Sequence, residues 1–227
     1  MKNKSNRCND CLIKSSLVMT LNSVETEKLE KNCTKAHFKK GDIIFKQNAF
    51  SSNIIYLNSG MAKIHISGPQ NEQTIKVVKA PSYLGIPTTL NEKINHYSAS
   101  ALEKTSVCFV DIGVFKDFIY KNGKFAYELI TELCRNELNS YRSCVNRTQK
   151  HIHGRIADAL LFFKNTYENN EFTLPFTRLE FGNFVDTSRE SVSRILTEFK
   201  NDGIINLNGK KVEILNEELL ETISNKG

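Results

Sequence analysis

Between Thr177 and Lys211, two short amphipathic segments follow each other across a tight turn, and an Asn-Gly dipeptide comes soon after the second. At about 100° per residue, the second segment turns one set of side chains to a common apolar face: Val192, Ile195, Leu196 and Phe199. The opposite arc carries a polar set: Arg189, Glu190, Ser193, Arg194 and Thr197. The pattern predicts a helix-turn-helix with one helix face in the core and the other exposed.

The ends of these segments are also marked. The first runs from Thr177 to Phe184, and the turn is Val185-Asp186-Thr187. Asp186 lies in this turn, and Asp is among the residues that tolerate a left-handed backbone. We expect Thr187 or Ser188 to cap the second helix, and Thr187 with Glu190 has the spacing of a capping box.

A basic hairpin is predicted after the second helix. Gly203 is expected to stop that helix, and Asn208-Gly209 lies between the apolar runs of residues 204–207 and 212–215. Asn-Gly at this place predicts a two-residue turn in which both residues have positive φ. Lys210 and Lys211 then make the hairpin a positively charged wing.

The polar face has the chemistry for reading DNA. Arginine makes bidentate contacts with guanine O6 and N7, and glutamate accepts from cytosine N4. An isolated amphipathic helix with such a face is more often an ordinary surface helix. Two helices, a tight turn and a basic wing in this order favour DNA binding, with four candidates for phosphate contacts: Thr177, Arg178, Ser188 and Lys210.

Composition agrees with this interpretation without establishing it. The 227 residues carry a formal charge of +6, which suits a polyanionic partner. No apolar run is long enough to cross a bilayer, and no secretory signal is visible. We therefore expect a cytoplasmic protein without a membrane partner, whose six cysteines do not form a disulfide framework. The sequence lacks the motifs typical of enzymes, so we do not expect an enzyme.

The N-terminal half has the period of strands. A helix is expected over residues 23–32, followed by strand candidates at 43–45, 53–57, 61–66, 73–78 and 105–110. Glycine and proline separate these runs, as in a jelly-roll or barrel.

An uninterrupted helical pattern then extends from Lys124 to Lys150. Steps of three and four residues join a possible two-stranded seam: Leu129, Leu133, Glu137, Ser140 and Cys144. The pattern alone leaves two alternatives open: the helix packs on the N-terminal domain of its own chain, or it pairs with a second copy.

Three stretches resemble the Crp/Fnr family of bacterial transcription regulators. Residues 187–196 resemble the recognition helix, residues 153–161 the start of the DNA-binding domain, and residues 38–42 with 55–60 the β-roll sensor. The resemblance covers nearly the whole chain and implies an α+β fold. The expected fold has three parts: a double-stranded β-helix (jelly-roll, cyclic-nucleotide-binding-like) sensor at 1–120, a dimerisation helix at 121–148 and a winged helix-turn-helix at 149–227.

The resemblance also implies roles. Arg189, Glu190 and Arg194 stand at base-contacting positions, and Ser193 where the Fnr branch has its own specificity residue. It implies a homodimer on a palindromic operator of double-stranded DNA, with a GA step in each half-site, acting in response to an unidentified signal. An activator would also contact RNA polymerase.

Cyclic AMP is not the expected ligand. Family members that bind cyclic nucleotides carry a Gly-Glu pair for the ribose and an Arg-Ser pair for the phosphate. The matching residues here are Gly85-Ile86 and Tyr97-Ser98. A regulator that depends on a cyclic nucleotide stays an alternative, although an unpaired phosphate in the pocket would be costly.

The cysteines resemble part of an iron-sulfur pattern. Cys8, Cys11 and Cys108 match three of the four thiolates of Fnr-type oxygen sensors, whereas Leu17 stands in place of the other. Cys33 or a histidine such as His37 is a candidate substitute. Because a cluster normally takes four ligands, cysteines without a chemical role are favoured over a cluster, another metal site or thiol redox sensing. A redox protein that uses Cys8 and Cys11 is the rival from another functional class.

Overall fold

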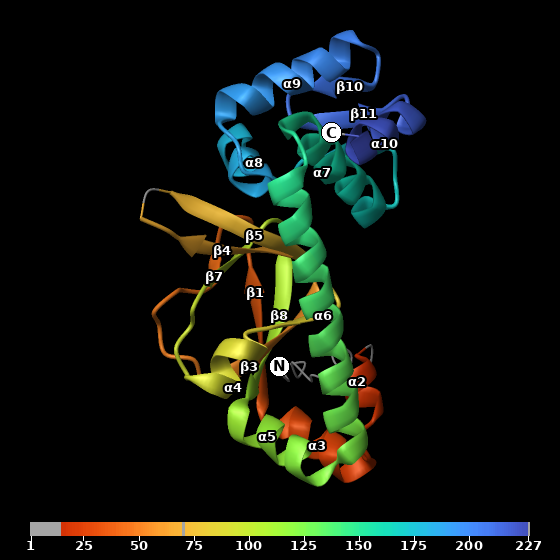
Figure 1. Cartoon of the computed structure of the whole chain (residues 1–227). Coiled ribbons are helices and arrows are strands. Elements are labelled where there is room, and N and C mark those ends of the chain that lie inside the picture. The colour runs from red at the N-terminus through yellow and green to blue at the C-terminus, as the bar shows by residue number, and fades with distance from the viewer. Residues whose placement is uncertain (1–14, 70, 227) are drawn as a thin grey trace, which may run out of the picture. The chain divides into compact units, whose positions relative to one another are not determined.

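The computed structural model describes residues 15–69 and 71–226, and the chain divides into two compact units. One comprises residues 1–71 and 75–136, the other residues 72–74 and 137–227. The first is a roll of strands covered by helices, and the second is a winged helix-turn-helix (Figure 1). The expected α+β class is confirmed.

The roll contains two four-stranded sheets among the described residues, ordered β1-β8-β3-β6 and β2-β7-β4-β5. The pairs β1–β8, β3–β8 and β4–β7 are antiparallel. The strands are β1 (Cys33–Phe38), β2 (Ile43–Phe45), β3 (Asn53–Ser59), β4 (Met61–Ser67), β5 (Glu72–Lys79), β6 (Ser82–Leu84), β7 (Ser98–Ala101) and β8 (Thr105–Asp111). All five strand candidates are confirmed, while β1, β6 and β7 were not predicted.

Two apolar clusters hold this unit together, and β3 contributes to both. Ile55 and Leu57 point between the two sheets, where they meet Ala62 and Val107. Ile54 and Tyr56 point to the other side and contribute to the cluster that α2, α3, α5 and α6 cover. Because both faces of β3 are buried at its centre, the four residues Ile54–Leu57 are large and mainly apolar instead of alternating with polar ones.

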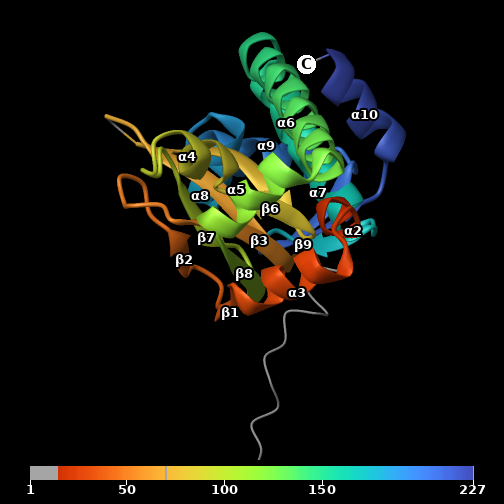
Figure 2. The same cartoon turned by 90° about the horizontal axis from the view of Figure 1, so that it is seen from below.

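Helices α2 (Ser16–Met19), α3 (Ser23–Lys31), α4 (Ile86–Asn91) and α5 (Ile112–Lys121) complete the unit. The predicted helix at 23–32 is confirmed as α3. Figure 1 shows α2, α3 and α5 together where α6 begins, and Figure 2, seen from below, shows α3 and α5 in front of the strands.

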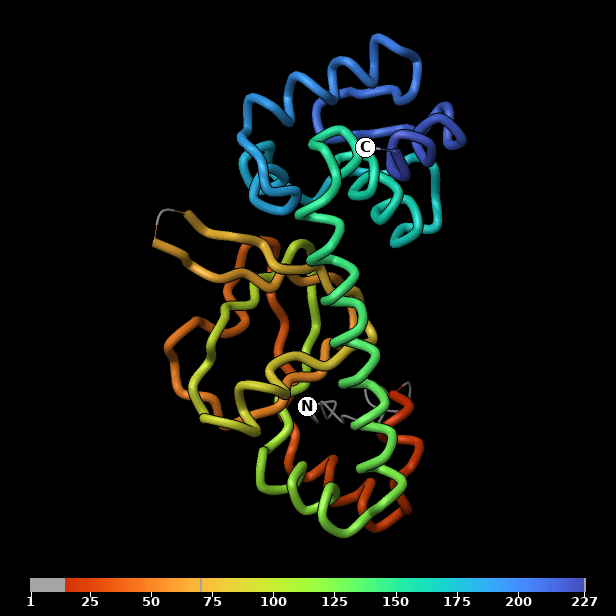
Figure 3. Tube along the Cα trace, viewed as in Figure 1, coloured from red at the N-terminus to blue at the C-terminus, as the bar shows by residue number. Residues whose placement is uncertain are grey.

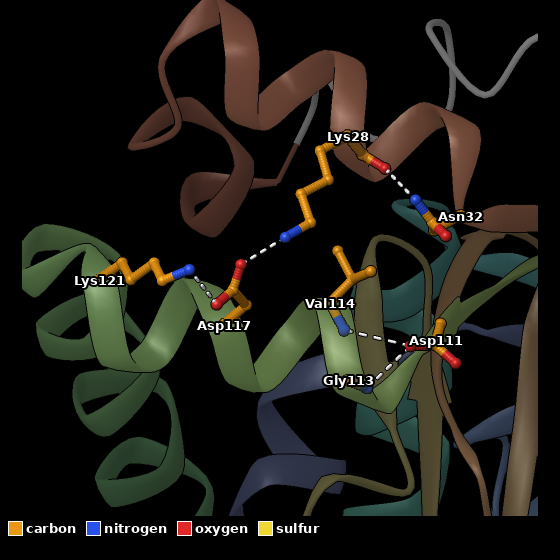
Figure 4. Close-up of polar contacts among 7 residues, drawn as sticks. All are labelled: Lys28, Asn32, Asp111, Gly113, Val114, Asp117 and Lys121. Carbon is orange, nitrogen blue, oxygen red and sulfur yellow. Dashed lines mark hydrogen bonds and ion pairs between the residues drawn. The ribbon is translucent and has the colours of Figure 1, made fainter.

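Asp111 joins β8 to α5 by capping the helix (Figure 4). Its carboxylate accepts from the backbone N–H of Gly113 at 2.8 Å and of Val114 at 3.1 Å. Farther along α5, Asp117 pairs with Lys121 at 2.7 Å and with Lys28 of α3. These contacts fix α3 against α5 and support the apolar cluster beneath them.

Helix α6 (Gly123–Gln149) fits the predicted long helix. Its start is fixed by Asn122, whose side chain accepts from the N–H of Phe125 and donates to the carbonyl of Thr20. Phe125 is 2 % exposed and Leu129 4 % exposed, and Leu133 packs against the same cluster. Leu129 and Leu133 therefore belong to the core of their own unit. Their assignment to a seam between two copies stays a prediction, and such a seam would start from side chains that already pack in their own unit.

The second unit contains α7 (Ile152–Tyr167), β9 (Glu171–Thr173), α8 (Arg178–Val185), α9 (Arg189–Asn201), β10 (Ile205–Asn208), β11 (Lys211–Ile214) and α10 (Glu217–Lys226). Its sheet has the order β10-β11-β9, and the chain path is traced in Figure 3. Phe163 of α7 is fully buried and lies within 6.4 Å of the rings of Phe172, Phe176 and Phe184. In the described part of the chain, no helix is both long and apolar enough to span a membrane.

Phe125 is expected to be essential for the first unit. Its ring lies edge-on to Phe115 at 5.2 Å and to Phe118 at 5.6 Å. Phe125→Ala should lower the free energy of unfolding by about 3–5 kcal/mol, since a large buried ring is lost without replacement. Chemical denaturation measures this, with the exposed Lys124→Ala as control. Equal stability of the two variants would contradict the packing described here.

Candidate nucleic-acid interface

Helix α8 begins with a complete capping box. The hydroxyl of Thr177 accepts from the N–H of Glu180 at 3.2 Å, and the carboxylate of Glu180 accepts from the N–H of Thr177 at 2.8 Å. The box lies at the first helix of the motif rather than at the second, where Thr187 and Glu190 were expected to form it. The hydroxyl of Thr177 therefore caps its own helix.

The turn between α8 and α9 depends on a close backbone approach. A Cβ on Gly182 would lie 2.6 Å from the carbonyl oxygen of Thr187, a distance that real Cβ atoms do not adopt. The N–H of Thr187 in turn donates to the carbonyl of Gly182 at 3.0 Å. Asp186 has φ 57° and ψ 57°, which confirms the left-handed turn residue. This geometry sets where α9 starts relative to α8.

Helix α9 has the two faces predicted from its sequence. Val192, Ile195 and Leu196 are 0 % exposed and Phe199 is 2 % exposed. The polar set is exposed: Arg189, Glu190, Ser193, Arg194 and Thr197. Ser188, not Thr187, is the N-cap, and its hydroxyl accepts from the N–H of Ser191 at 3.1 Å.

Two acidic residues shape the charge of this face. The pKa of Glu190 is lowered by hydrogen bonds from its own backbone N–H and from Ser188, so Glu190 is ionised at neutral pH. Arg194 pairs through Nη1 with Oε1 of Glu198 at 2.7 Å, one turn farther along α9. The face thus carries both signs of charge. This suits base edges, which offer both donors and acceptors, better than it suits the uniformly anionic phosphates.

The wing is tied to the start of α8. Nη2 of Arg178 donates to the carbonyl of Gly209 at 2.7 Å, and burial lowers the pKa of Arg178. Asn208 pairs with Lys211 in the sheet, so the turn residues are Gly209 and Lys210. Of these two only Gly209 has positive φ, at 60°. The expectation of positive φ at both Asn208 and Gly209, as in a type I′ turn, is wrong. Glycine at the first central position is typical of a type II′ turn, in which only that residue has positive φ.

Sequence reasoning missed two residues of this region. Oε2 of Glu198 lies 3.0 Å from Nε2 of His153, a residue on the second position of α7. The i,i+4 spacing from Arg194 would have identified Glu198 as its partner. His153 gave no such signal, because its partner lies 45 residues away along the chain.

In the roll, the residues matched to the cyclic-nucleotide positions are engaged in packing. Ile86 is 4 % exposed and belongs to the helix-covered cluster. The hydroxyl of Tyr97 accepts from the N–H of Gly85 at 3.3 Å, and its ring lies 5.5 Å from that of Phe45. A cyclic nucleotide would meet neither a carboxylate at Ile86 nor a guanidinium at Tyr97.

The cysteines predicted as metal ligands are only partly visible. Cys8 and Cys11 lie outside the described residues. Cys108 is 0 % exposed on β8, inside the helix-covered cluster. Cys33 is disulfide-bonded, which the expected absence of disulfides did not anticipate. Within the described residues no three His, Cys, Asp or Glu side chains are arranged to hold a metal ion. These residues do not by themselves fit an iron-sulfur cluster.

Comparisons with known proteins assign both units. Residues 154–223 match the Crp-like helix-turn-helix domain, and residues 35–122 match the cyclic nucleotide-binding domain. The chain is 26 % identical over 215 residues to the transcriptional activator protein FnrA of Stutzerimonas stutzeri, covering 92 % of this chain and 88 % of that protein. It is 26 % identical over 224 residues to the fumarate and nitrate reduction regulatory protein of Vibrio cholerae, covering 94 % and 89 %. Among solved structures, FixK2 from Bradyrhizobium japonicum has a similar fold, with a TM-score of 0.76, 17 % identity and coverage of 84 % and 96 %.

Gly182→Ala tests the turn. The added methyl group should force α8 and α9 apart and lower the free energy of unfolding by about 1–3 kcal/mol, as overpacking does. The measurement is unfolding of the protein by denaturant, in which the helical circular dichroism signal is monitored. Leu179→Ala, at a side chain that is 58 % exposed on the same helix, should change stability little. A Gly182→Ala protein as stable as the original would show that the turn tolerates a side chain.

Proposed function

Because the chain belongs to the Crp/Fnr family of transcription regulators and carries its helix-turn-helix DNA-binding domain, we propose that it binds a palindromic operator as a homodimer. The observation that carries this proposal is the exposed polar face of α9, held in place by a buried apolar face and the Gly182 turn. Its relatives are regulators rather than enzymes. A regulator of this kind works on the chromosome, so we place it in the cytoplasm.

The polar face of α9 supports base reading by four residues: Arg189, Glu190, Ser193 and Arg194. Arg189 and Glu190 stand in the first turn of α9, the part of a recognition helix that reaches base edges. The arginines suit guanine and Glu190 suits cytosine, in a half-site that contains a GA step.

Phosphate contacts are proposed for residues around this face: Thr177, Arg178, Ser188 and Lys210. Thr177 and Ser188 cap the N-termini of α8 and α9, where backbone N–H groups favour anions. Lys210 is exposed at the wing tip, which Arg178 holds against α8. These contacts would fix the register of the protein on the duplex without reading its sequence.

An exposed apolar stripe on α6 supports the homodimer. At about 100° per residue, six residues fall within an arc of about 80°: Tyr127, Ile130, Cys134, Leu138, Tyr141 and Val145. The five large side chains are between 49 % and 72 % exposed. This stripe is rotated by about 100° from the predicted seam, of which Glu137, Ser140 and Cys144 are exposed beside it. A second copy of α6 would bury the stripe and bring two α9 helices onto one operator.

Two half-sites about 34 Å apart, one turn of DNA, follow from a dimer of this kind. Activation of transcription would require an additional contact with RNA polymerase. The signal is to be sought in the roll, where Ile86 and Tyr97 replace the groups that hold a cyclic nucleotide.

Arg194→Ala tests base reading. Loss of a bidentate contact should weaken binding to the operator by about 1–3 kcal/mol and binding to random duplex much less. Fluorescence anisotropy with both duplexes measures the two losses. Lys210→Ala is the matched control, since loss of a phosphate contact should weaken both duplexes alike. Equal losses for Arg194→Ala would exclude base reading by this residue.

Ile130→Glu tests the dimer. Its side chain is 57 % exposed in one chain, so the carboxylate costs little there, whereas a dimer would bury two of them. The dimer dissociation constant from sedimentation should rise by at least about tenfold. Ser143→Glu, on roughly the opposite face of α6, should leave it unchanged. An unaffected dimer in the Ile130→Glu protein would place the interface elsewhere.

A further inference from the structure

One carboxylate at the interface has two partners. Oε1 of Glu198 accepts from Nη1 of Arg194 at 2.7 Å, and Oε2 lies 3.0 Å from Nε2 of His153. The side chains of Arg194, Glu198 and His153 are 58 %, 39 % and 46 % exposed. Each oxygen thus has its own partner, so neither partner excludes the other by geometry.

The position of His153 is set by the core. Its ring centroid lies 6.2 Å from that of Phe199, which is 2 % exposed. His153 also lines a cavity of about 430 Å³, together with Glu198, Phe199, Asn201, Asp202, Ile204 and Ile223. The imidazole therefore approaches Glu198 from a different helix, α7, and its position is fixed by packing against Phe199.

His153 has both acidic and apolar neighbours. Glu198 of α9 and Asp202, the residue after α9, line the same cavity as His153, together with the apolar Ile204 and Ile223 of α10. Hydrogen bonding to His153 is the largest cause that lowers the pKa of Glu198, followed by the contacts of Arg194. Glu198 is therefore ionised across the range in which histidines titrate, between about pH 5 and 8.

We propose that Glu198 is the positioning residue of Arg194, and that protonation of His153 releases Arg194 from Glu198 for contact with guanine. This inference rests on the proposed base-reading role of Arg194. It adds a proton-dependent control of operator specificity, in which His153 and Glu198 act through Arg194 and need not touch DNA themselves.

The physical reason is a balance of charge. A bidentate contact with guanine takes two N–H donors of Arg194, including the side that Glu198 now holds. When Arg194 moves from Glu198 to a guanine, the Glu198 carboxylate lies near the polyanionic DNA. Its remaining partner in this network is then His153. A positive His153 compensates that carboxylate, whereas a neutral His153 does not.

The sign of the pH dependence follows. Operator binding removes the arginine charge from the network and brings phosphates near, and both changes favour the imidazolium. Binding to the operator is therefore coupled to proton uptake, and operator affinity falls as pH rises through the histidine range. Binding to a random duplex depends on its phosphates and does not require Arg194 to leave Glu198. The pH dependence should therefore appear in the ratio of operator affinity to random-duplex affinity.

The experiment compares this ratio at about pH 6 and about pH 8, the two sides of an ordinary histidine titration. The operator is a duplex enriched from a random-sequence pool by this protein, and the competitor is its scrambled counterpart. The original protein should favour its operator roughly threefold to tenfold more strongly at the lower pH. His153→Gln, which keeps a donor but cannot be protonated, should show a ratio that does not change with pH.

Two variants complete the test. His151→Gln alters another exposed histidine two residues away and should keep the full pH dependence. Glu198→Gln should remove the pH dependence and give at about pH 8 the high ratio that the original protein shows at about pH 6. A His153→Gln protein with the original pH dependence would overturn the inference.

Arg194→Ala separates this inference from the function on which it rests. If Arg194→Ala leaves the ratio of affinities intact, base reading by Arg194 fails, and the inference fails with it. If Arg194→Ala lowers the ratio while His153→Gln and Glu198→Gln both titrate like the original protein, base reading stands and only the inference fails.

Discussion

The interface depends on the close approach of two backbones at Gly182. The carbonyl oxygen of Thr187 lies only 2.6 Å from the place where any other residue would carry its Cβ. This approach, with Asp186 in a left-handed conformation, fixes the first residue of α9 relative to α8. Because Val192, Ile195 and Leu196 are fully buried, the rotation of α9 about its axis is fixed as well. The direction of Arg189, Glu190 and Arg194 is a consequence of these two constraints, and the proposed base contacts rest on it.

Helix α6 illustrates how packing decides between two faces that a sequence pattern leaves open. Leu129 and Leu133 follow heptad spacing, yet they lie against the roll, since Phe125 and Asn122 fix the start of the helix there. Tyr127, Ile130 and Tyr141 then remain on the outside. One face of the helix thus packs in its own unit, and the proposed homodimer would use the exposed face.

The parts of the fold that could be predicted are those with strong local signals. The long helix, both helices of the motif and five strands follow from periodicity, and Gly203 with Asp186 marks the helix ends. Strand β7 could not be predicted, because Ser98–Ala101 consists of small residues and is a strand only by being buried between β2 and β4. The pair of Glu198 with His153 joins α9 to α7, and the wing turn depends on the pairing of Asn208 with Lys211. Contacts between distant segments leave no local pattern.

The most direct test of the account is to select binding sequences from a pool of random duplexes. If two copies of α9 read DNA from a symmetric dimer, the enriched sequences should contain an inverted repeat. Its half-sites should each hold a GA step and lie about 34 Å apart, close to one helical turn. Enrichment of a single half-site, of a direct repeat, or of no common sequence would contradict the claim that a homodimer reads a palindromic operator through α9.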